Sequence, residues 1–258
     1  MNPIFDLTKV LQLPVLASEH GKGVDALIIW VHWLMIALFV GWLAFFFYAI
    51  LRFRKSKSPK ADYVGVKTHA STYIEVAVAI VEGVLLIGLA IPLWAKSVDK
   101  FPDAKDATVI RVVAEQFTWN SRYPGPDGIF GKQDIRLLAP DNLLGYVTDD
   151  PHGKDDITPP LKEMHVPVNK PVIVHLTSKD VIHSFQIDPM RVTQDAIPGM
   201  SIPTQFTPTI PGKYQITCAQ LCGSGHSTMN GYFTVDTEED YNKWLADKSK
   251  STSATTFE

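Results

Sequence analysis

Two long apolar stretches dominate the first part of the chain. Residues 27–51 contain no Asp, Glu, Lys or Arg, and residues 74–95 are interrupted only by Glu75 and Glu82. Each stretch is at least as long as the roughly 20 residues that a helix needs to cross the hydrocarbon core of a bilayer. The pattern therefore predicts two transmembrane helices that form a hairpin.

The segment between the two stretches is strongly basic. Residues 52–67 hold six Lys or Arg against a single acidic residue, Asp62. Because basic loops are retained in the cytoplasm, we expect this loop inside and both termini outside. In a bacterium the chain would be a multi-pass protein of the inner membrane, with its C-terminal part on the periplasmic or outer side.

After Lys96 the apolar runs give way to short β-type segments separated by Pro, Gly and Asp. No helical pattern of about 10–15 residues alternates with these segments, which favours an all-β sandwich or barrel over an α/β domain. A short helix is expected at residues 238–247, with Thr237 as its N-cap. Four segments rich in β-branched and aromatic residues are expected to be strands: residues 108–114, 171–177, 212–218 and 231–235.

Charge divides the chain in the same place. The first 95 residues carry eight basic and six acidic side chains, whereas the remainder carries sixteen basic and twenty-one acidic ones, a net charge of −5. The absence of a large basic block argues against nucleic-acid binding. The expected organisation is an external segment at 1–26, a transmembrane hairpin at 27–95, an outer domain at 96–247 and a flexible tail at 248–258.

The only two cysteines, Cys218 and Cys222, lie in the segment TCAQLCGSGHSTM together with His226 and Met229. So few cysteines exclude a disulfide-dense scaffold, and no C-x-x-C-H sequence is present to attach a c-type haem. Thiolate, imidazole and thioether groups form a soft donor set that suits copper better than calcium or magnesium. A mononuclear blue-copper site uses one Cys, so the second thiolate indicates a pair of bridged copper ions.

A copper pair requires a second imidazole, and His183 is the best candidate. It lies in the segment KDVIHSFQI, 35 residues before Cys218 and after a predicted strand. The other histidines lie in the membrane part, in a polar loop, or in and beside strands. A disulfide and a zinc site are the alternatives, but a disulfide leaves His226 and Met229 unexplained, and zinc leaves Met229 without a role.

These features together resemble subunit II of the haem–copper cytochrome c oxidases. The resemblance rests on the hairpin, the DV-x-H-S-F segment, the DAIPG stretch at residues 195–199 and the motif C-x-Q-x-C-x-x-x-H-x-x-M, and it covers nearly the whole chain. It implies a cupredoxin-like Greek-key barrel that holds a dinuclear copper A centre. The implied ligands are the side chains of His183, Cys218, Cys222, His226 and Met229 and the backbone carbonyl of Gln220.

The resemblance also implies a function and partners. The chain would accept electrons from cytochrome c, or from a cytochrome c domain, and pass them to subunit I, which carries the haems, reduces oxygen to water and pumps protons. Other oxidase subunits and the lipid bilayer would surround it. An acidic outer domain suits a basic electron donor, and Asp180, beside the His183 segment, is the candidate for docking it.

Five residues differ from the family pattern or bear on it in other ways. Gln220 replaces the commoner Glu and weakens the case for a magnesium or manganese site, because a neutral amide is a poorer ligand for a hard cation. In EQFTWNSRYP, Phe117 occupies the position that usually holds the electron-accepting Trp, and Trp119 is the second candidate. Glu75 matches the family's glutamate at the mouth of the K proton pathway, whereas Glu82 is not explained by the resemblance.

Three other protein classes share parts of this pattern. A membrane-tethered copper carrier or assembly protein would expose a ligand-poor site that releases Cu(I). Subunit II of quinol oxidases lacks the copper ligands, and the copper domain of nitrous oxide reductase lacks the hairpin. The complete ligand set and the hairpin therefore favour an oxidase subunit.

Overall fold

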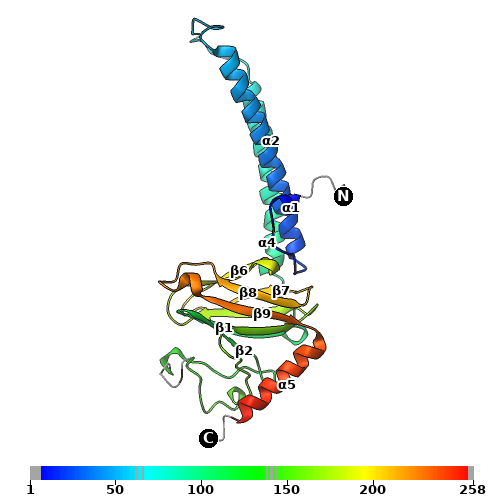
Figure 1. The fold of residues 1–258 in the computed structure, drawn as a ribbon, viewed down its shortest axis with the longest axis vertical. Coiled ribbons are helices and arrows are strands. Elements are labelled where there is room, and N and C mark those ends of the chain that lie inside the picture. The colour runs from blue at the N-terminus through cyan, green and yellow to red at the C-terminus, as the bar shows by residue number, and fades with distance from the viewer. Residues whose placement is uncertain are drawn as a thin grey trace. The chain divides into compact units, whose positions relative to one another are not determined.

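The computed structural model describes residues 7–254 except for 62, 66, 138, 140, 141 and 143. The chain divides into two compact units (Figure 1). One unit, residues 1–13 and 23–96, contains the long apolar helices, and the other, residues 14–22 and 97–258, contains the strands. We call the second the β unit.

The helical unit contains two helices that are long and apolar enough to cross a membrane. The first, α2, spans Gly21–Phe53, and a one-turn helix, α1, precedes it at Leu7–Val10. The second is continuous over Ala70–Val98. Both predicted apolar stretches lie inside these helices. The second helix is built from α3 at Ala70–Gly83, a π-helical segment η1 at Val84–Ala90 and α4 at Ile91–Val98.

Two sheets form the β unit. The strand order is β2-β1-β4-β7 in the first sheet and β3-β9-β8-β5-β6 in the second. Strand β1 pairs with β4, and β3 with β9, in parallel, while the other pairs are antiparallel. The strands are β1 Thr108–Glu115, β2 Thr118–Arg122, β3 Glu163–Pro167, β4 Val172–Ser178, β5 His183–Ile187, β6 Val192–Ala196, β7 Ile202–Phe206, β8 Gly212–Cys218 and β9 Asn230–Asp236. Short 3-10 turns occur at Ala104–Asp106, Ile135–Leu137, Pro151–Gly153, Asp188–Met190 and His226–Thr228.

The core of the β unit follows from the alternation of side chains along the strands. In β1 every second residue, beginning with Thr108, is buried, so residues such as Arg111 face the other side of the sheet. Trp119, Phe185 and Phe233 fill the interior and are at most 2% exposed. Burial of each such side chain stabilises the fold by roughly 1.5–3 kcal/mol. The architecture confirms the predicted fold class of two apolar helices and a cupredoxin-like β domain.

The structure adds strands that the pattern did not reveal. All four predicted strands are present. The strands that were not predicted, β2, β3, β5, β6 and β7, are only five residues long, and several carry polar residues at alternate positions. Such short runs have no clear apolar period.

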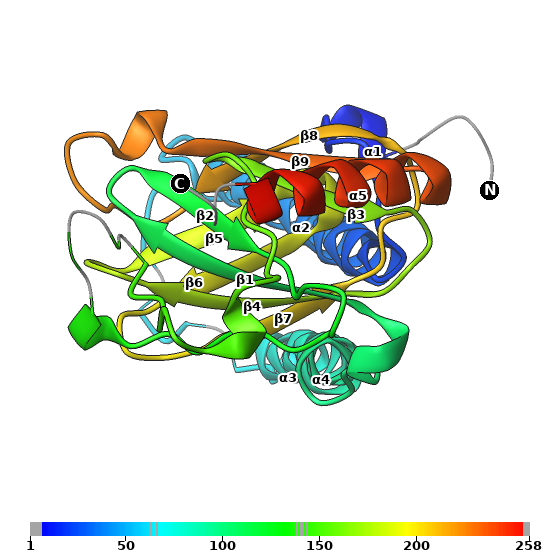
Figure 2. The same ribbon diagram turned by 90° about the horizontal axis from the view of Figure 1, so that it is seen from below.

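The terminal helix α5 spans Glu238–Ala254 and therefore continues into residues that we expected to form a flexible tail. It begins where predicted, since Thr237 Oγ1 accepts a hydrogen bond from the Asp240 N–H at 3.2 Å. Helix α5 lies against β3 and β9 (Figure 2). The last four residues, 255–258, and the first six lie outside the described part of the chain.

Residues 14–22, which we call the N-terminal strap, belong to the β unit although they precede α2. The Ala17 N–H donates to the Pro189 carbonyl, and the Thr209 N–H donates to the Ala17 carbonyl, both at 2.8 Å. Ala17 and Ser18 are fully buried. The segment predicted as simply external is thus partly a structural element of the β domain.

Candidate metal centre

The predicted ligands meet at one end of the five-stranded sheet. Cys218 is the last residue of β8, and Met229 directly precedes β9, so Cys222 lies in the loop between these strands. His183 is the first residue of β5, which pairs with β8. Strand pairing therefore brings an imidazole beside a thiol that is 35 residues away in sequence.

The two thiols lie at the centre of the cluster. Cys218 Sγ and Cys222 Sγ are 3.8 Å apart, and both cysteines are free. Because a disulfide bond is only about 2.05 Å long, the disulfide alternative does not describe this structure. Each sulfur has an imidazole neighbour: His183 Nδ1 is 3.9 Å from Cys218 Sγ, and His226 Nδ1 is 3.7 Å from Cys222 Sγ.

Two weaker donors complete the cluster. Met229 Sδ is 3.8 Å from Cys222 Sγ, and the Gln220 carbonyl accepts a hydrogen bond from the Cys218 thiol at 3.1 Å. Cys222 and Met229 are buried, whereas His226 is half-buried. The structure thus brings all six predicted ligand positions into one place.

The spacing of the donor atoms fits the binding of soft metal ions. The neighbouring sulfur and imidazole donors are 3.7 to 3.9 Å apart. Two ligands at about 2.0–2.3 Å from one tetrahedral ion are separated by roughly 3.3–3.8 Å, so little movement is needed for binding. Burial and the adjacent Cys218 thiol raise the pKa of Cys222 to about 11, and a bound metal must therefore displace a proton from that thiol.

Asp180 fixes the orientation of His183. Asp180 Oδ1 accepts a hydrogen bond from His183 Nε2 at 2.8 Å, which leaves Nδ1 to face the sulfur atoms. Burial by itself would raise the pKa of Asp180, but hydrogen bonds from His183 and from two backbone N–H groups outweigh burial, and the pKa is lowered. The predicted docking residue is therefore also a support for a predicted ligand.

Gln116 is a second supporting residue, and we did not predict it. Its side-chain Nε2 donates to the Cys222 carbonyl at 2.6 Å, and its backbone N–H donates to Asp180 Oδ2 at 2.7 Å. Gln116 thus links the metal-binding loop to the carboxylate that holds His183. No local pattern indicates this role, because 106 residues separate Gln116 from Cys222.

The two aromatic candidates lie at different depths. Trp119 is 2% exposed, and its ring is edge-on to the His183 ring with 6.2 Å between centroids. Phe117 is half-buried and packs against the loop at Gly225, where an added Cβ would come within 2.4 Å of the Phe117 ring. Of the two rings, Phe117 is the one with substantial exposure to solvent.

The two membrane carboxylates are both in α3. Glu75 lies in its second turn and Glu82 in its last, and both are exposed. Within the described part of the chain neither carboxylate has a hydrogen bond or an ion-pair partner. The seven-residue spacing places them on one face of the helix.

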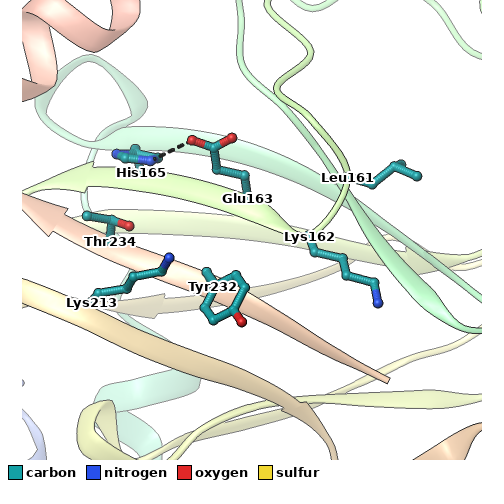
Figure 3. Close-up of a pocket in the computed structure, with 7 residues that line it drawn as sticks. All are labelled: Leu161, Lys162, Glu163, His165, Lys213, Tyr232 and Thr234. Carbon is teal, nitrogen blue, oxygen red and sulfur yellow. Dashed lines mark hydrogen bonds and ion pairs between the residues drawn. The ribbon is translucent and has the colours of Figure 1, made fainter. Parts of the chain in front are cut away.

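A separate groove of about 370 Å³ lies over β3, β8 and β9 and contains none of the predicted ligands (Figure 3). His165 borders it, with Nε2 3.0 Å from Glu163 and Nδ1 2.6 Å from Asp236. Both ring nitrogens are therefore already bonded to carboxylates. This histidine joins β3 to β9 and does not offer a free nitrogen to a metal.

Residues 108–234 match the family model described as cytochrome c oxidase subunit II, periplasmic domain. The alternative cytochrome c oxidase subunit 2 of Bradyrhizobium diazoefficiens is 33% identical over 214 residues, which cover 83% of this chain and 76% of that protein. Cytochrome c oxidase subunit 2 of Synechocystis is 27% identical over 253 residues, 91% of this chain and 75% of that protein.

Among solved structures, the periplasmic domain of subunit II of cytochrome oxidase from Bradyrhizobium japonicum is 28% identical. The superposed region covers 56% of this chain and 95% of that domain, with a TM-score of 0.41.

Proposed function

The chain belongs to the cytochrome c oxidase subunit II family, and on this basis we propose that it is the subunit through which electrons enter a haem–copper oxidase. It would accept electrons from cytochrome c, or from a cytochrome c domain, at a dinuclear copper A centre and deliver them to the oxygen-reducing, proton-pumping subunit I. The observation that carries this proposal is the cluster of two facing thiols, each with its own imidazole neighbour.

The protein's part in this function is to hold the ligands in one geometry. Copper would supply a one-electron carrier whose charge is shared between two ions. The proposed ligands are His183, Cys218, Gln220 through its carbonyl, Cys222, His226 and Met229. Asp180 and Gln116 would keep the cluster rigid, which limits rearrangement when an electron arrives or leaves. The haems belong to the partner subunit, and we assign no magnesium or manganese site beside Gln220.

The route of electron uptake would begin at the exposed edge of Phe117. Phe117 contacts the loop that carries Cys222, and Trp119 packs edge-on against His183. The net charge of −5 on residues 96–258 would attract a basic donor. Asp180 remains the docking candidate, because its side chain is 31% exposed even though it also bonds to His183.

The N-terminal strap supports the proposed topology. The strap precedes α2 and the strands follow α4, yet both belong to one packed unit. This packing supports a topology in which both ends of the helical pair would lie on the same side of a membrane, as two crossings require. With the basic loop in the cytoplasm, the copper domain and both termini would face the periplasmic side of a bacterial inner membrane. Glu75 would serve a proton pathway in the assembled oxidase.

Copper analysis and EPR spectroscopy of the purified full-length chain test the central proposal. Two copper ions per chain and a seven-line hyperfine pattern are expected, because one unpaired electron would be shared by two copper nuclei. One copper per chain with a four-line spectrum would exclude the dinuclear centre.

Flash-induced electron transfer from reduced cytochrome c tests the aromatic route in the complete oxidase. Phe117→Ala should slow uptake more than Trp119→Ala, since Phe117 is the more exposed ring; unchanged rates in both variants would remove the route.

In the same complex, Glu75→Gln should slow proton uptake and turnover, with Glu82→Gln as its comparison on the same helix face. Normal rates in Glu75→Gln would defeat the pathway role.

A further inference from the structure

Three basic side chains form a row across the outer face of the four-stranded sheet. The strand register pairs Arg122 of β2 with Arg111 of β1, and Arg111 with His175 of β4. Basic groups at directly paired positions of neighbouring strands repel each other when charged. We call these three residues the basic row. A negatively charged group nearby would reduce the repulsion between them.

Within the described part of the chain, one member of the basic row, Arg122, has a carboxylate partner. Arg122 forms a buried ion pair with Asp156, and its guanidinium lies 4.1 Å from the ring centroid of Tyr146. Arg111 donates one hydrogen bond, to the Gly131 carbonyl at 3.3 Å, and lies over the Phe130 ring. Among the residues that the structure describes, no carboxylate forms an ion pair with Arg111, and none bonds to His175.

Arg111 and His175 line a cleft of about 530 Å³ on this face. Outward-facing residues of β1 and β4 form its floor, while Phe130 and the segment at residues 199–201 lie at its sides. Of the residues that the structure describes, no acidic one lines the cleft. Its polar lining residues are Arg111, Gln133, His175, Thr177 and Ser201.

The electrostatics of the cleft agree with this geometry. Burial and the charge of Arg122 lower the pKa of Arg111, and Asp156 opposes this only weakly. Burial and Arg111 lower the pKa of His175. Both basic groups are therefore less easily charged than in water, which is the behaviour expected where a negative charge is missing.

We propose that this cleft binds a small oxyanion of the phosphate type. Arginine presents a planar fork that binds two oxygens at once, and the imidazole, amide and hydroxyl groups offer further donors. A phosphate has enough acceptor oxygens to meet several of these donors, whereas a carboxylate has only two. This site is on the sheet face and is independent of the proposed copper function.

Titration calorimetry of the full-length chain in detergent tests this site, with inorganic phosphate and pyrophosphate as probes at constant ionic strength. Saturable binding to one site is expected. Arg111→Gln should weaken it by roughly 10- to 100-fold, because hydrogen bonds to a charged group are lost. Arg136→Gln is the matched control, since Arg136 is exposed and already bonded to Asp134; it should bind like the unchanged protein.

A second variant separates binding from folding, because Arg111 also bonds to the Gly131 carbonyl. Arg111→Lys keeps the charge but not the fork, so it should retain the fold and bind phosphate at least several-fold more weakly. Circular dichroism verifies the fold of each variant. The proposal is wrong if phosphate does not bind, if the Arg111 and Arg136 variants bind alike, or if acetate binds as tightly as phosphate.

Discussion

The two polar clusters of the β unit are organised in opposite ways. In the metal centre every donor has another donor within 3.9 Å, and Asp180 holds one imidazole in place. In the basic row, Arg122 is neutralised by a buried carboxylate, but Arg111 faces a cleft to which the described residues contribute no carboxylate. The donors of the candidate metal centre contact one another, and we call it the closed cluster. Arg111 of the basic row faces a cleft, and we call the basic row the open cluster.

The difference shows what each cluster can bind. Soft donors that converge in a buried pocket suit ions that stay in place and are seldom exchanged. An unbalanced cation is costly when it is fully buried, so Arg111 remains half-buried where water or a ligand can reach it. The closed cluster is thus suited to a resident cofactor, and the open one to a ligand that comes and goes.

The largest effect is expected where the closed cluster loses a sulfur that we propose bridges two copper ions. Cys222→Ser replaces a thiol that contacts His226, Met229 and the other thiol, and a hydroxyl is a poor substitute for soft ions. Copper analysis should find fewer than two ions per chain, and the seven-line EPR signal should disappear. Leu221→Ala changes a neighbouring side chain that is 76% exposed and should keep both. Two copper ions in Cys222→Ser would contradict the bridging role.

The second prediction removes the carboxylate that forms the ion pair with Arg122 of the basic row. Asp156→Asn leaves Arg122 buried and uncompensated, which should lower the free energy of unfolding by about 3–5 kcal/mol. Urea denaturation measures this change. Asp134→Asn, which breaks an exposed pair with Arg136, is the control and should have little effect. Equal stability of the two variants would show that the buried pair does not support the fold.

A smaller effect is expected at the support of the closed cluster. Asp180→Asn keeps the shape of the side chain but removes the charge that holds His183, so copper affinity should fall by about 10- to 100-fold. Competition with a chelator measures the affinity. Asp188→Asn, an exposed carboxylate bonded to Gln186, should leave it unchanged. An unaltered affinity in Asp180→Asn would mean that packing alone orients His183.

The smallest expected effect is the pH dependence of the loop at residues 127–131, which contacts Arg111 of the basic row. His152 Nδ1 lies 2.6 Å from Asp127 Oδ2; this hydrogen bond raises the pKa of His152 and lowers that of Asp127. The stabilisation that His152 contributes is complete below the ordinary histidine pKa of about 6.5 and is lost as pH rises through the raised pKa. The stabilisation that Asp127 contributes is lost as pH falls through its lowered pKa. Protection of the Ile129 amide, which donates to Asp127 Oδ1, should thus be several-fold greater near pH 5 than near pH 8. His152→Gln should abolish this difference in hydrogen exchange.

The sequence predicted those features that depend on local signals. The two long helices were predicted from the length of the apolar runs. The ligand cluster was predicted from the close spacing of Cys218, Cys222, His226 and Met229. The short strands and Gln116 were missed, because each depends on a partner far along the chain. Arg111 was missed for the same reason, since its uncompensated charge exists only once three strands are paired.

The N-terminal strap has a consequence for the order in which the protein is made. Ser18 bonds to the Met190 carbonyl, 172 residues later in the chain. The ribosome therefore completes both apolar helices and strands β1 to β5 before this partner of the strap exists. The strap precedes α2 but can pack only after these strands have been synthesised, so completion of the β unit requires segments from both ends of the helical pair.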